Sequence, residues 1–173
     1  MGLSACCLLF GICCLRYDVF VMSSGAKRTY LAHVVSMAGS WWGILLSTFV
    51  VYFISPIPQA KLLNFLLWIF VPTVSSEIFK LLVRRPRPVD RGEDAKVKAY
   101  GYSFPSSHTV AAFMVASWVL LVPELRWWSW LFAAWPIFVG WSRVWLRAHD
   151  GLDVAGGVVF GALATCAAWV LNK

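Results

Sequence analysis

The sequence predicts an all-α protein, a polytopic membrane bundle with five firm transmembrane helices and a possible sixth at the N-terminus. Of its 173 residues, 60% are hydrophobic and only 13% are charged, whereas a soluble domain averages about 25% charged residues. The length suits a single domain over residues 1–173. The net charge is +7, and the basic residues cluster beside the apolar runs. This placement favours membrane lipids and phosphate substrates as partners over nucleic acid.

The possible sixth helix lies at residues 3–21. Residues 3–15 are apolar, but Arg16 and Asp18 follow them, and a membrane span needs about 20 apolar residues. A first membrane helix, a re-entrant segment and a surface helix all remain open.

Five longer apolar segments predict the firm spans, at residues 30–54, 61–79, 109–122, 127–145 and 152–171. Small residues in the first and last of them suit close helix packing in a bilayer. Pro136 is expected to kink the fourth. Because the third and fourth spans go out and back, the polar segments 80–108 and 142–153 are expected on the same side of the membrane.

Segment 142–153 carries an arginine, a histidine and a carboxylate between two apolar runs. His149 and Asp153 are four residues apart, which on a helix places them on one face. The carboxylate can then fix the histidine tautomer and leave the other ring nitrogen free to attack. Arg143 can bind two oxygens of a phosphate. The alternative is an interfacial loop with snorkelling basic side chains.

Segment 80–108 offers further cations and a helix start. Lys80 ends the second span, and the prolines around Arg87 hold the chain extended, so both cations can reach one point. Three cations, with Arg143, suit a phosphate dianion. The alternative is a positive cluster that only sets topology.

Ser106 is a candidate N-cap for the third span. The N–H groups that follow can cradle a phosphate, and His108 in the first turn can exchange protons with a leaving oxygen and with water. An ordinary capped helix with an interfacial histidine is the alternative.

Other charged residues have less definite interpretations. Glu77, near the end of the second span, is either functional or a structural partner for a nearby arginine. The loop cations are interpreted chiefly as a solvated loop, with contact to a second phosphate or a headgroup sugar as the alternative; they are Arg84, Arg85, Arg91, Lys96 and Lys98. No acidic cluster suits Mg²⁺ and no cysteine–histidine spacing suits zinc, so neither metal nor cofactor is expected.

Taken together, these motifs resemble the type 2 phosphatidic acid phosphatase family of integral-membrane lipid phosphatases, which is related to glucose-6-phosphatase and the vanadium haloperoxidases. The resemblance covers about residues 30–171. It rests on three segments in order, which are Lys80-x6-Arg87-Pro88, Pro105-Ser106-Ser107-His108 and Ser142-Arg143-x5-His149-x3-Asp153.

The resemblance implies roles for eight residues. His149 is the implied nucleophile that forms a phosphohistidine, Asp153 orients it, and His108 protonates the leaving group and then activates water. The implied phosphate-binding residues are Lys80, Arg87, Ser106, Ser107 and Arg143. The family usually has glycine at position 107, so Ser107 adds a side chain whose packing must be accommodated.

The expected activity is metal-independent hydrolysis of a lipid phosphate or diphosphate through a phosphohistidine. The family's substrates include phosphatidylglycerophosphate, phosphatidic acid and lipid A phosphates; undecaprenyl diphosphate is our first choice, because the small size and short loops resemble bacterial members. A non-catalytic lipid-phosphate-binding scaffold and a lipid transporter are the alternatives. The resemblance places the site on the periplasmic or external face of a bacterial inner membrane, whereas the charge distribution points to the opposite face. The oligomeric state is left open.

Overall fold

The computed structural model describes residues 24–54, 59–94, 96–97, 99–171, and over these residues every regular element is a helix. The α-helices are α2 (Ser24–Ala38), α3 (Trp41–Ile54), α4 (Gln59–Val83), α5 (Ser107–Leu121), α6 (Ser129–Trp145) and α7 (Gly151–Leu171), with short 3-10 helices η2 (Val89–Arg91) and η3 (Pro123–Trp128). The all-α prediction is confirmed there. The possible helix at residues 3–21 lies outside the described residues.

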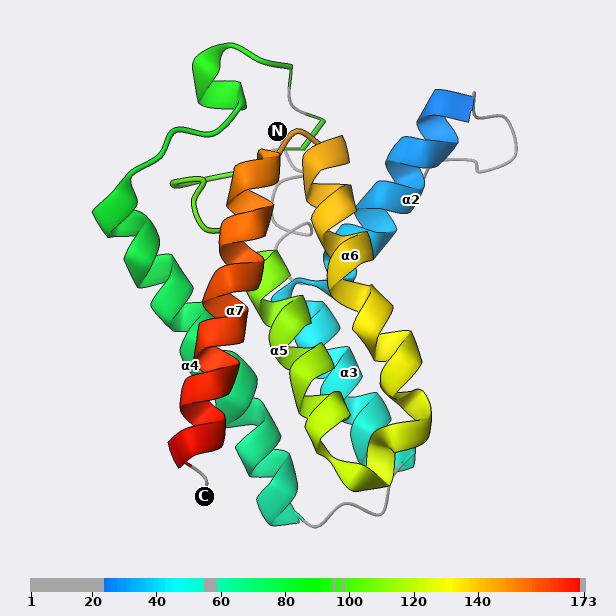
Figure 1. Ribbon diagram of the computed structural model, residues 1–173. Coiled ribbons are helices and arrows are strands. Elements are labelled where there is room, and N and C mark those ends of the chain that lie inside the picture. The colour runs from blue at the N-terminus through cyan, green and yellow to red at the C-terminus, as the bar shows by residue number, and fades with distance from the viewer. Residues whose placement is uncertain (1–23, 55–58, 95, 98, 172–173) are drawn as a thin grey trace, which may run out of the picture.

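The central helix of the bundle is α5, which packs against α4, α6 and α7 (Figure 1). Helix α2 lies along α6, and α3 connects back toward α4. The 84–106 loop and the α6–α7 turn lie at one end of the bundle, and η3 lies at the other (Figure 1). The prediction that both polar segments share one side is therefore met.

The predicted first span, residues 30–54, is wrong as one continuous helix. The structure divides it at Gly39 and Ser40 into α2 and α3. Glycine in a helix interior costs about 1 kcal/mol relative to alanine. The amides of Gly39 and Ser40 donate to the Ser36 and Met37 carbonyls, three residues back, and such bonds tighten the last turn of a helix.

Helix α4 is longer than predicted. It continues to Val83, so Lys80 lies inside its last turn and does not end it. The helix stops three residues before Pro86, and Arg84 has a left-handed backbone (φ 50°). Pro86 disfavours helical geometry at Arg85, the residue before it, so the helix cannot continue far beyond Val83.

Two described segments, Leu63–Val83 and Gly151–Val170, are long and apolar enough to cross a membrane, while α5 is apolar but shorter. Large apolar side chains also face outward all round the bundle, for example Phe53, Leu82 and Leu163, as they do where lipid takes the place of water. Five complete spans remain a prediction.

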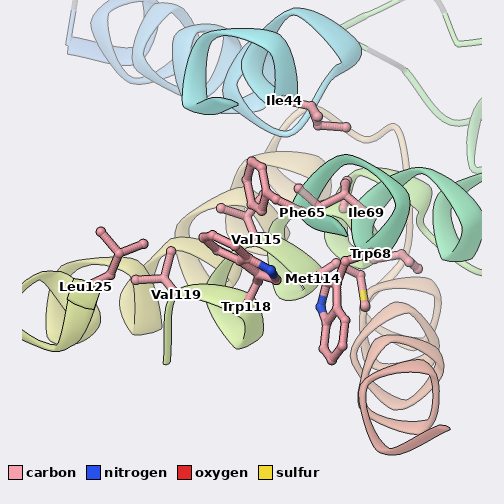
Figure 2. Close-up of a cluster of buried hydrophobic side chains, with 11 residues drawn as sticks. Ile44, Phe65, Trp68, Ile69, Met114, Val115, Trp118, Val119 and Leu125 are labelled. Atoms are coloured by element: carbon pink, nitrogen blue, oxygen red, sulfur yellow. The ribbon is translucent and has the colours of Figure 1, made fainter. Parts of the chain in front are cut away.

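The hydrophobic core lies chiefly between α4 and α5 (Figure 2). The rings of Phe65 and Trp118 meet in a tilted pair with centroids 4.5 Å apart. The indole of Trp68 donates a 3.3 Å hydrogen bond to the Ser117 hydroxyl, which satisfies its buried N–H. This core packs α4 against α5. It thereby positions the C-terminal end of α4 relative to the N-terminal end of α5 at the site.

Candidate active site

The eight predicted site residues come together at one end of the bundle. Lys80 lies in the last turn of α4, Arg143 in the last turn of α6, and Asp153 in the first turn of α7. His108 and His149 interact electrostatically with each other and with the same three cations, Lys80, Arg87 and Arg143.

His149 does not lie on a helix with Asp153, contrary to the prediction. It belongs to the turn before α7, where the Ala148 and His149 amides both donate to the Arg143 carbonyl (3.1 and 3.3 Å). Its Nδ1 still lies 3.6 Å from Asp153 Oδ2. The turn thus makes the contact that the helix periodicity was expected to make.

The two nitrogens of the His149 ring have different surroundings. Nδ1 faces the Asp153 carboxylate at a separation longer than a hydrogen bond, of the kind that shortens when substrate binds. Nε2 lies 3.3 Å from Arg87 Nη1. Burial lowers the pKa of His149 to about 4; Asp153 opposes this shift, and Arg143, Arg87 and Lys80 add to it. The ring is therefore neutral at physiological pH.

Asp153 is fully buried and is held by several donors. Its Oδ2 accepts hydrogen bonds from the Ser103 hydroxyl and the Asp150 amide. Arg85 Nη1 lies 3.3 Å from Oδ1, within ion-pair distance but without hydrogen-bond alignment, since Oδ1 has no hydrogen-bond partner. These contacts keep the carboxylate charged and aimed at His149.

Arg85, which was expected chiefly as a solvated loop residue, bridges two carboxylates. Its Nη2 donates to Asp150 Oδ2 at 3.0 Å, while Nη1 approaches Asp153. Arg91 also donates to Asp150, and Arg147 pairs with Glu93. The interpretation of these loop cations as solvated is therefore wrong for the half-buried Arg85, whereas Arg91 is exposed and pairs with the α6–α7 turn at the surface.

Arg87 binds protein groups as well as facing His149. Its guanidinium donates to the carbonyls of Gly101, Ala148 and Tyr100, at 2.7, 3.0 and 2.8 Å. These bonds tie the 84–106 loop to the His149 turn. Arg87 is therefore an anchor between two segments as well as a cation beside the nucleophile candidate.

Ser106 occupies the predicted N-cap position of α5, but its side chain makes no capping hydrogen bond. Its hydroxyl accepts a 3.1 Å bond from the Thr109 hydroxyl, so it is already engaged. Its amide donates to the Asp153 carbonyl at 2.9 Å. The prediction that the Ser106 side chain caps α5 is therefore wrong. Its backbone amide instead links the start of α5 to the start of α7.

The Ser107 side chain points to α4. A 2.9 Å bond joins its hydroxyl to that of Ser76, which is fully buried. The side chain added at this position therefore has a buried hydrogen-bond partner on α4. Glu77, expected to be functional or to pair with an arginine, pairs with Lys80 at 2.9 Å.

A pocket of about 400 Å³ borders His149 on the loop side. Its walls include Trp141, Trp145, Lys96 and Arg147, and Lys96 lies over the Trp145 ring at 4.3 Å. Its lining does not include His108 or Arg143. The position predicted for a phosphate, between the two histidines, is therefore not part of this pocket.

The chain matches a known protein family over more than half of its length. The model of the PAP2 superfamily matches residues 61–173. The protein called bacitracin transport permease protein BcrC of Bacillus licheniformis is 40% identical over 62 residues, which are 36% of this chain and 30% of that protein's length. The match thus spans less than a third of that relative.

A solved structure gives the fold more completely. The crystal structure described as the first transmembrane PAP2 type phosphatidylglycerolphosphate phosphatase, from Bacillus subtilis, superposes with a TM-score of 0.73 and 21% identity. The superposition covers 89% of this chain and 80% of that one. At this identity the likeness establishes the shared fold.

Proposed function

This chain belongs to the PAP2 superfamily, and from that membership we propose that it is a membrane lipid phosphatase acting on a lipid phosphate or diphosphate. One observation carries the proposal. His149 presents Nδ1 to the buried Asp153 carboxylate and Nε2 to the cation Arg87, which is the orientation an attacking imidazole needs.

In the proposed reaction, the His149 Nε2 lone pair attacks phosphorus and the bond from phosphorus to the lipid-side oxygen breaks. Protonated His108 gives its proton to that oxygen, and the lipid product leaves. His108 then takes a proton from water, the water oxygen attacks phosphorus, and the phosphorus–nitrogen bond breaks to release inorganic phosphate. Lys80, Arg87 and Arg143 offset the negative charge throughout.

The start of α5 is the proposed cradle for the phosphate oxygens. Backbone N–H groups at a helix start, here at Ser107 and His108, favour an anion, and Lys80, Arg87 and Arg143 interact electrostatically with His108 in this helix turn. Asp153 holds Nδ1–H of His149 and stabilises the positive charge that the ring carries once it is phosphorylated. The proposed chemistry needs neither metal nor cofactor.

The decisive experiment is phosphate release from detergent-solubilised lipid phosphates by the wild type and by His149→Ala. We expect the variant to fold and to lose release entirely, and labelled phosphate to be trapped on His149 of the wild type. Normal activity of His149→Ala would exclude the mechanism.

The substrate proposed first is undecaprenyl diphosphate, with phosphatidylglycerophosphate, phosphatidic acid and lipid A phosphates as the other candidates. Purified protein assayed with all four at equal surface concentration tests the choice. The highest kcat/KM is expected for the polyprenyl diphosphate, and a preference for another lipid would replace it.

Transport is the second candidate, because the name of the Bacillus licheniformis relative describes a transport permease. Substrate flux into sealed vesicles without hydrolysis supports transport, whereas phosphate release without flux supports the phosphatase. A protein that only binds lipid phosphates would show neither substrate flux nor phosphate release.

A further inference from the structure

The break between α2 and α3 lies directly against the proposed phosphate site. A Cβ atom placed on Gly39 would come 2.7 Å from Val139 Cγ1, 3.2 Å from the His108 carbonyl oxygen and 3.3 Å from His108 Cβ. Only a residue without a side chain fits there. The chain at Gly39 thus touches the backbone of the acid–base candidate.

One turn earlier on α2, Ser36 contacts Arg143. Arg143 Nη1 donates a hydrogen bond to the Ser36 hydroxyl, and both side chains are only 6% exposed. No carboxylate of the described residues lies within ion-pair distance of Arg143. Ser36 is therefore the neutral anchor of a buried cation.

This anchor leaves the rest of the Arg143 guanidinium available. Its Nε is buried without a hydrogen-bond partner among the described residues, and a buried N–H without a partner is costly. An arginine binds a phosphate through two adjacent N–H groups in a planar fork. With Nη1 fixed on Ser36, the Nε edge is free to bind an oxyanion.

We propose that Ser36 is a positioning residue, which holds Arg143 so that its Nε edge meets a phosphate oxygen. The inference rests on the proposed function. It assigns a part of the site to α2, which lies outside the segment 61–173 matched by the family model. The neutral hydroxyl orients the cation without neutralising it, as a carboxylate would.

The test is Ser36→Ala in the full-length protein, with two measurements. The first is kcat and KM for lipid phosphate release. The second is the rise in thermal midpoint on adding inorganic phosphate, which reports binding without catalysis. We expect kcat/KM to fall roughly 10-fold, since hydrogen bonds to charged groups are among the stronger ones, and the phosphate-induced rise to shrink.

Ser40→Ala is the matched control. Ser40 lies at the same break, but its hydroxyl donates to the Met37 carbonyl and does not contact Arg143. It is expected to keep the wild-type kcat/KM and phosphate response. Ser36→Thr, which retains a hydroxyl, is expected to recover most of the activity. If Ser36→Ala does not fold, Ser36→Cys, similar in size and a weak acceptor, takes its place.

Two results separate this inference from the proposed function. A wild type that releases no phosphate from any lipid contradicts the function, and the phosphate-induced thermal shift then still tests Ser36. An active wild type with unchanged kcat/KM and unchanged phosphate response in Ser36→Ala overturns the inference. A lower thermal midpoint with unchanged phosphate response and kcat/KM also overturns it, because Ser36 is then only structural.

Discussion

At the scale of single residues, the site depends on side chains that hold the chemical groups in place. Asp153 contacts Ser103, Asp150, Arg85 and His149. A buried carboxylate keeps its charge only with such partners. The orientation of His149 therefore depends on residues that never contact substrate in the proposed reaction.

Arg85→Gln is expected to lower kcat by up to about 100-fold, because a misplaced catalytic group can cost that much, with little change in KM. It removes the cation that bridges Asp150 and Asp153. Arg85→Lys keeps the charge but cannot span both carboxylates, so it should recover part of the rate.

Arg84→Gln is the control for this prediction, because the Arg84 side chain donates to the Leu81 carbonyl at the end of α4 and pairs with no carboxylate of the described residues. Steady-state kinetics of all three variants with one lipid substrate checks the prediction. Equal rates for Arg84→Gln and Arg85→Gln would contradict it.

The stability of the protein is expected to fall at acid pH because of His149. Its pKa is about 4 in the folded protein and about 6.5 in an unfolded chain, so below pH 6.5 the unfolded state takes up a proton that the folded state refuses. The free energy of unfolding therefore declines from pH 6.5 toward pH 4, by about 3 kcal/mol in all. Above pH 6.5 this residue adds no pH dependence.

Thermal unfolding of the detergent-solubilised protein between pH 7 and pH 4.5 measures this effect. His149→Gln, whose side chain does not titrate, is expected to lose less stability over that range than the wild type. Identical pH profiles of the two proteins would show that His149 does not carry the effect.

At the scale of elements, close contact between α5 and α7 places the phosphate cradle beside Asp153. A Cβ atom on Gly157 would lie 2.8 Å from the Ser106 carbonyl oxygen and 3.0 Å from Thr109 Cβ. The Ser106 amide meanwhile donates to the Asp153 carbonyl. Separating these helices therefore moves the oxyanion donors and the nucleophile support apart.

Gly157→Ala is expected to cost about 1–3 kcal/mol of stability, the usual cost of overpacking, and to reduce phosphate release. Gly151→Ala, in the same helix, is the control, because a Cβ atom there meets nothing within 4 Å. Thermal unfolding and activity of both variants check the prediction. A Gly157→Ala protein as stable and active as Gly151→Ala would contradict it.

At the scale of the whole molecule, the polar loop and the α6–α7 turn close one end of the bundle (Figure 1). Hydrogen bonds between them, such as that from the Lys96 amide to the Leu146 carbonyl (3.1 Å), join segments far apart in sequence. All the proposed chemistry therefore faces one side of the membrane.

We propose that this side is external. Asp94 is exposed in the loop, so Asp94→Cys in a background without the five native cysteines should react with an impermeant maleimide in intact cells. Pro123→Cys, at an exposed position at the opposite end in η3, should react only after the membrane is opened. The reverse pattern would place the site on the cytoplasmic face.

Sequence alone predicts the helical class, the two polar segments at one end of the bundle, and the eight candidate residues that meet there. Those features follow from long apolar runs and from side-chain chemistry, which a chain carries locally. Only the folded structure reveals the helix break at Gly39, the turn that holds His149, and the contacts of Ser36, Arg85 and Ser76. These residues have no distinctive local sequence pattern, because their roles come from the packing of helices that are distant in sequence. A serine or an arginine becomes an anchor only when such packing buries it beside a charged partner.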